Sequence, residues 1–94
     1  MSQRRVIRGR DGLDTIYTRV CVYRGQTEEY EYDTLLEDFF RSEAGQWVLE
    51  HSDLEKPEIL WNFDYQRFYK NVQVWTWLSD VNLTYWNLRW NTGT

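Results

Sequence analysis

The feature that most constrains the fold of this 94-residue chain is the alternating pattern of side chains from Phe68 to Leu78. Successive side chains of a strand point to opposite faces, so the valines of VQVWTWL share one face and Trp75 and Trp77 share the other. A second stretch, Glu58 to Tyr65, alternates in the same way a few residues earlier. The two stretches therefore predict an antiparallel hairpin.

The residues before this hairpin predict one more strand and a helix. Side chains alternate over residues 15–23, as in a half-buried strand. Thr34 and Glu37 fit a capping box, and apolar residues then recur at spacings of three and four, which predicts a main helix over about residues 34–51. Gly45 interrupts that pattern, so either the helix breaks there into two short ones or close packing against the sheet requires the missing side chain.

The remaining segments complete an α+β pattern. Residues 28–33, EEYEYD, fit a short strand, and residues 84–90 fit either a last strand or a short helix. We therefore predict an antiparallel sheet of about four strands with the main helix on one face. The nearest simple template is the ferredoxin-like βαββ(α)β arrangement, with its second helix shortened.

The length fits a single domain, preceded by a basic arm. Residues 1–13 contain glycines and arginines that no amphipathic pattern organises, which predicts a flexible arm. Residues 14–94 are then predicted to form one α+β domain, large enough to fold without disulfides or a structural metal.

Several classes of protein are disfavoured by what the sequence contains. Cys21 is the single cysteine and His51 the single histidine, so the sequence predicts neither an internal disulfide nor a Cys/His zinc site. We find no nucleophile–base pattern and no phosphate-binding glycine motif, and we predict no enzyme, no metal and no cofactor. No stretch approaches the ~20 apolar residues that span a bilayer, which predicts a soluble, cytoplasmic protein without a membrane partner.

Charge is unevenly distributed along the chain, although the net charge is only −4. Residues 1–27 carry six arginines against two acidic residues, whereas residues 28–64 carry twelve acidic residues against two basic ones. Charge blocks of this kind govern steering and partner choice rather than the fold.

Two sets of side chains are candidates for binding a partner. The first is a row of rings with an arginine, which would share the open face of the sheet if the first and third strands are neighbours: Tyr17, Arg19, Tyr23, Tyr69, Trp75 and Trp77. The second is an acidic run that supplies charge complementarity: Glu28, Glu29, Glu31 and Asp33.

Three occupants of the aromatic face remain open. The aromatic C-terminal segment of the chain itself would bury it, or a protein partner or second copy would cover it in an interface. Alternatively, the rings would stack the bases of a single-stranded nucleic acid, with phosphate contacts from Arg4, Arg5, Arg8 and Arg10.

Two sequence phrases resemble those of short proteins of large tailed bacteriophages, including cyanophages. They are F-x-x-S-x-x-G-x-W-V-x-E-H, Phe39 to His51, and D-x-x-x-T-Y-x-x-L-R-W, Asp80 to Trp90. Together they cover about a quarter of the chain and contain no functional motif. The resemblance implies a host-cell cytoplasm and a task such as inhibiting a host factor, regulating phage gene expression or helping virion assembly.

The sequence thus predicts a small, phage-encoded, non-enzymatic binding protein that contacts a protein partner stoichiometrically, as an inhibitor or accessory factor. Two alternatives are a single-stranded nucleic-acid binder or translational regulator, and a virion or assembly component. The partner and the oligomeric state are not specified by the sequence.

Overall fold

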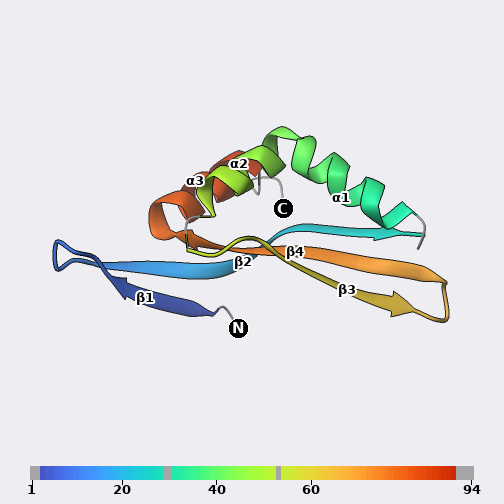
Figure 1. Ribbon diagram of the computed structural model, residues 1–94, viewed down its shortest axis with the longest axis horizontal. Helices are drawn as coiled ribbons and strands as arrows, with labels where there is room; N and C mark the ends of the chain where they lie inside the picture. Colours follow the sequence, from blue (N-terminus) through green and yellow to red (C-terminus); the bar gives the residue numbers. More distant parts are fainter. Residues whose placement is uncertain (1–2, 29–30, 53, 91–94) are drawn as a thin grey trace.

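The computed structural model describes residues 3–28, 31–52 and 54–90. Four antiparallel strands form one twisted sheet in the order β1-β2-β4-β3, and the helices lie on one face of it (Figure 1). The elements in chain order are β1 (Arg4–Arg8), β2 (Asp14–Thr27), α1 (Tyr32–Arg41), α2 (Glu43–His51), β3 (Glu58–Asp64), β4 (Tyr69–Ser79) and α3 (Asp80–Trp90). The predicted α+β class and the four-stranded antiparallel sheet are confirmed.

The order of the elements differs from the ferredoxin-like template, which is not confirmed. The described chain begins with a hairpin and ends with a helix, in the order ββααββα. Of the predicted strand over residues 28–33, residues 29 and 30 lie outside the described residues, and α1 already begins at Tyr32. Residues 84–90 lie in α3. No helix within the described residues is long and apolar enough to cross a membrane.

The fourth strand comes from the segment expected to be a flexible arm. Arg4–Arg8 forms β1 and pairs antiparallel with β2, so that Arg4 lies opposite Thr18. The connecting turn depends on its two glycines: Gly9 N–H donates to the Leu13 carbonyl (2.7 Å), and Gly12 has a φ of 81°. The positive φ of Gly12 suits glycine, so the glycines expected to mark a flexible arm form a hairpin turn instead.

The core lies between the helices and the two central strands. The predicted hairpin is present as β3 and β4, and the β4 valines, Val72 and Val74, are 1% and 0% exposed. Val74 packs in one core cluster with Val48 of α2 and Trp86 of α3, on the helical side of the sheet. The valine row of VQVWTWL therefore faces the helices, and Trp75 and Trp77 face the other side of the sheet.

The main helix is interrupted as one alternative predicted, but the break lies at Ser42, three residues before Gly45, and the close contact of Gly45 is with α1 rather than with the sheet. The helix ends at Arg41, and α2 begins at Glu43 with Ser42 as its N-cap, whose hydroxyl accepts from Gly45 N–H (3.1 Å). A Cβ on Gly45 would lie 1.9 Å from the Phe39 carbonyl oxygen. The elbow between α1 and α2 therefore excludes any side chain at residue 45.

We expect Gly45→Ala to lower the free energy of unfolding by about 1–3 kcal/mol, the usual cost of forcing an added methyl group into a packed site. Glu50→Ala, an exposed change on the same helix, should stay within about 0.5 kcal/mol of wild type. Urea denaturation of both variants, followed by circular dichroism, measures the difference. Equal stability of the two variants would contradict the close contact at the elbow.

Candidate functional site

The open face of the sheet carries an arginine–tryptophan ladder, which consists of Arg5, Trp77, Arg19 and Trp75. Arg19 lies directly opposite Trp77 across the β2–β4 pair. The guanidinium carbon of Arg5 lies 4.4 Å from the centroid of Trp77, and that of Arg19 lies 4.4 Å from the centroid of Trp75. Each of these cations thus covers a ring at a distance typical of cation–π contacts.

Carboxylates neutralise both arginines of the ladder. Arg19 forms an ion pair with Glu58 of β3 (3.0 Å), and Arg5 forms one with Glu55, which precedes β3. Arginines from the basic N-terminal block therefore meet carboxylates from the acidic middle block. These two guanidinium groups are therefore engaged in contacts within the chain.

The ladder decides how the predicted aromatic row is covered. Trp77 is only 8% exposed, and Trp75 and Tyr17 are partly buried. The covering groups are arginines of the sheet itself, whereas the C-terminal helix lies on the other face (Figure 1). The structure thus brings Tyr17, Arg19, Trp75 and Trp77 together as predicted, but with Trp77 largely sealed from solvent.

Tyr23 does not belong to this face, because a bulge reverses the alternation of β2. Cys21 pairs with Trp75 and Tyr23 pairs with Val74, so Val22 is the extra residue. The Tyr23 ring stacks on Phe39 of α1, with centroids 4.7 Å apart. Burial, and secondarily the charge of Asp38, raises the pKa of the Tyr23 hydroxyl.

The predicted acidic run lies at the opposite end of the molecule from the turn between β1 and β2 (Figure 1). Glu28, Glu31 and Asp33 are exposed there, and Glu29 lies outside the described residues. A hollow of about 270 Å³ opens between the end of β2 and the start of α1. Its lining residues are Thr27, Glu31, Thr34, Leu35 and Asp38.

Exposed rings lie at this same end, because Lys70 of β4 pairs with Thr27 of β2. Tyr69 is 42% exposed, and Phe68, in the turn before it, is 72% exposed. We call the hollow with Glu28, Asp33, Phe68 and Tyr69 the acidic end. Within the described part of the chain, no ion pair joins the carboxylates of Glu28, Glu31, Asp33 and Asp38 to a basic side chain.

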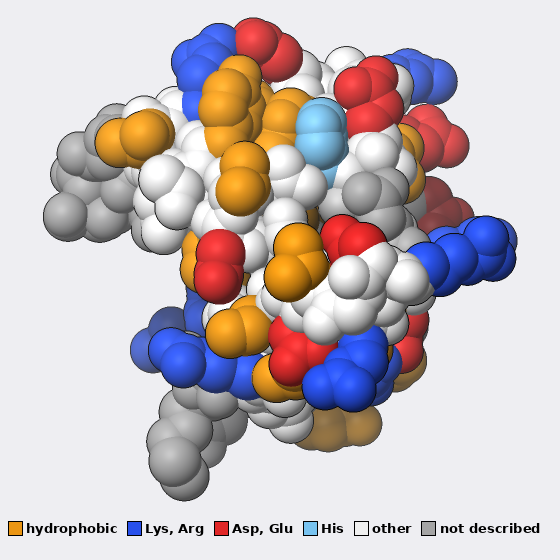
Figure 2. Space-filling view, turned by 90° about the vertical axis from the view of Figure 1, so that its left-hand side faces the viewer, with side chains coloured by type: hydrophobic (Ala, Val, Ile, Leu, Met, Phe, Trp, Pro, Cys, Tyr) orange, Lys and Arg blue, Asp and Glu red, His pale blue; other side chains and the backbone are white. Residues whose placement is uncertain are grey.

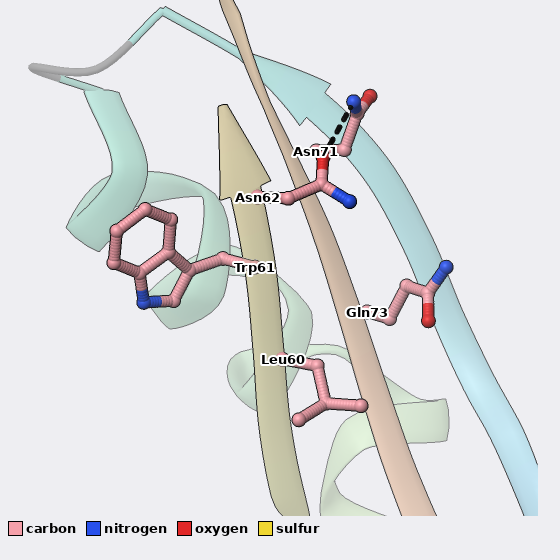
Figure 3. Close-up of a pocket in the computed structure, with 5 residues that line it drawn as sticks. All are labelled: Leu60, Trp61, Asn62, Asn71 and Gln73. Carbon is pink, nitrogen blue, oxygen red and sulfur yellow. Dashed lines mark hydrogen bonds between the residues drawn. The ribbon is translucent and has the colours of Figure 1, made fainter. Parts of the chain in front are cut away.

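A second exposed surface, which the sequence did not predict, lies along the edge strand β3. Ile59, Leu60 and Trp61 are 39%, 39% and 57% exposed, respectively. Figure 3 shows Trp61 on one side of β3 and Leu60 and Asn62 on the other. The signal in the sequence was Leu60, the single apolar residue in the otherwise polar row of this strand.

The polar side chains that line the shallow hollow drawn in Figure 3 already form hydrogen bonds within the chain. It has a volume of about 160 Å³ and is lined by Leu60, Trp61, Asn62, Asn71 and Gln73. Its two asparagines bond to each other, Asn71 Nδ2 to Asn62 Oδ1 at 3.0 Å, and Gln73 accepts from the Trp75 indole N–H at 2.9 Å.

A cluster of rings surrounds His51 at the far end of the helices. The imidazole stacks on Trp47 with centroids 4.3 Å apart, and its Nδ1–H donates to the Trp47 carbonyl at 2.8 Å. Tyr85 of α3 stacks on the same indole. Figure 2 shows the histidine at the surface among hydrophobic side chains.

His51 and Cys21 lie apart from the acidic end. The thiol of Cys21 donates to the Tyr23 carbonyl oxygen at 3.2 Å. Among the residues that the structure describes, no three His, Cys, Asp or Glu side chains form a group suited to a metal ion. The expectation that the chain binds no metal stays a prediction.

Comparisons with known protein families, curated protein sequences and solved structures gave no match.

We expect the ladder to contribute measurable stability through its ring contacts. In a double-mutant cycle of Arg19→Met and Trp75→Leu, the coupling energy should be about 0.5–1 kcal/mol, because each single change removes the same cation–π contact. Urea denaturation of the four proteins measures it. Strictly additive effects would show that the ring and the guanidinium group do not interact.

Proposed function

We propose that this protein is a small non-enzymatic binding protein that acts by stoichiometric contact with a protein partner at the acidic end. The observation that carries this proposal is the hollow between Glu31 and Asp38, two carboxylates without an ion pair among the described residues. Its chemistry fits a lysine or arginine side chain of the partner.

The lining of the hollow suits both parts of such a side chain. Leu35 and the threonine methyl groups would contact its aliphatic stem, and the two carboxylates would accept charge-assisted hydrogen bonds from its head group. Phe68 and Tyr69 extend the surface with rings, the side chains enriched in protein interfaces. The surrounding negative charge would steer a basic partner toward this end.

We also propose that the protein is phage-encoded, because two of its sequence phrases resemble those of short bacteriophage proteins. A phage-encoded protein acting in the host cytoplasm as an inhibitor or accessory factor needs only this kind of stoichiometric contact. The nucleic-acid alternative has less support, because Arg5 and Arg19 are ion-paired and cover the rings that would stack bases. We propose no catalytic role.

Selection of peptides from a random displayed library on the immobilised protein tests this function. We expect the selected peptides to be enriched in lysine and arginine and to bind with a 1:1 stoichiometry by calorimetry. Binding should weaken as salt rises, since exposed charges are screened. A single-stranded RNA pool, run in parallel, tests the alternative by the same salt dependence.

Charge-removing variants locate the contact on the surface. Glu31→Gln and Asp38→Asn should each weaken the best peptide about tenfold, because each removes one acceptor of a charge-assisted hydrogen bond. Glu50→Gln makes the same change in charge on the exposed surface of α2 and should leave the affinity unchanged. An equal loss in all three variants, or no enrichment of basic peptides, would refute a specific site at the acidic end.

A further inference from the structure

The two edges of the sheet are protected to different degrees. β1 carries Arg4, Arg5 and Arg8 along its five residues, and charged side chains keep an edge strand from pairing with another chain. β3 has the sequence EILWNFD, with charges only at its two ends and no proline. Its central residues combine exposed apolar side chains with an edge that no other described strand occupies.

We propose that β3 pairs with β3 of a second copy of this chain, antiparallel, about a two-fold axis through Leu60. The pairing joins two four-stranded sheets into one continuous sheet. Leu60 then lies opposite the partner's Leu60, and Ile59 lies opposite the partner's Trp61. This inference concerns a surface other than the acidic end and does not depend on the proposed function.

Charge complementarity selects this register. An axis through Trp61 would place Glu58 opposite the partner's Asp64, and like charges directly opposite each other destabilise a strand pair. An axis through Asn62 would place Leu60 opposite a carboxylate. An axis through Leu60 places Glu58 opposite the partner's Asn62 and, at the ends of the pair, Lys56 opposite the partner's Asp64. Registers displaced by one residue would put apolar and polar faces on the same side.

A hollow beside β3 is positioned to receive the rings of the second copy. It has a volume of about 470 Å³ and lies between the helical elbow and the segment before β3, lined by Phe40, Leu49, Ser52, Lys56 and Pro57. Trp61 pairs with the buried Val72 and so belongs to the face that the helices cover. On that face the partner's Trp61 would lie opposite Ile59, and the partner's Phe63 opposite Pro57, one of the lining residues.

The dimer also leaves both outer edges protected. An isologous pairing uses the same patch on both copies and closes on itself. Each outer edge of the joined sheet is then a β1 strand with its arginines. Pairing of β3 with β1 of another copy would not close in this way and would give open chains.

Cysteine cross-linking tests the register directly. In a Cys21→Ser background, Leu60→Cys, Trp61→Cys and Asn62→Cys are oxidised separately and resolved on non-reducing gels. Opposed residues of an antiparallel pair have Cα atoms about 4.5–5.5 Å apart, a distance that a disulfide spans. We expect rapid dimer formation for Leu60→Cys alone. The other two positions are offset from their own copies by two and four residues, so faster cross-linking at either would overturn the register.

Sedimentation of the protein without any other partner tests the dimer itself. We expect a monomer–dimer equilibrium for wild type and loss of the dimer for Leu60→Lys, which places like charges on the axis. Val81→Lys, which adds the same charge at an exposed position on α3, should leave the equilibrium unchanged. A concentration-independent monomer, or growth beyond the dimer, would overturn the proposal. Circular dichroism checks folding, and the cysteine experiment decides the matter if Leu60→Lys does not fold.

Discussion

The pairing of β2 with β4 is the interaction on which the rest of the structure depends. It runs from Tyr17 opposite Ser79 to Thr27 opposite Lys70 and joins strands far apart in the sequence. Its helix-facing side supplies Val72, Val74 and Leu78 to the core, and its other side carries the arginine–tryptophan ladder. A slip of one residue would exchange these two sets, so hydrophobic burial on one face and cation–π contacts on the other specify the same register.

Because the arginine–tryptophan ladder covers the open face of the sheet, the surfaces that remain free to bind a partner lie at the ends and edges of the molecule. Trp77 and Trp75 are covered by Arg5 and Arg19, and the charges of these arginines are balanced by Glu55 and Glu58. Glu28, Glu31, Asp33 and Asp38 have no such partners among the described ion pairs, whereas Glu37 pairs with Arg41. Ile59, Leu60 and Trp61 are exposed on the edge strand β3. The molecule is also elongated, 50 Å by 24 Å by 24 Å, so the acidic end is distant from the turn between β1 and β2. The surfaces proposed to bind partners, the acidic end and the β3 edge, are therefore separate from the side chains that hold the sheet together.

The charge blocks of the sequence have different fates in the fold. Part of the basic block folds back as β1 and β2, where arginines cover tryptophans and pair with carboxylates of residues 55 and 58. The acidic block around α1 stays in solvent, where carboxylates are stable without partners. A net charge of −4 gives no sign of this division, because it sums paired and unpaired side chains alike.

By itself the sequence determined the local structure that depends on periodicity: the β3–β4 hairpin, the strand before the helices, the helical face and the side of VQVWTWL that enters the core. Only the tertiary structure decided the elements and surfaces that depend on distant partners. Arg4–Arg8 becomes a strand because β2 offers it an edge, Tyr23 changes face because a bulge inserts Val22, and Trp77 is covered because Arg5 lies over it. Periodicity acts over neighbouring residues, whereas strand order and cation–π pairs join residues dozens of positions apart, which is why the sequence predicted the rings and carboxylates but not which of them would remain exposed.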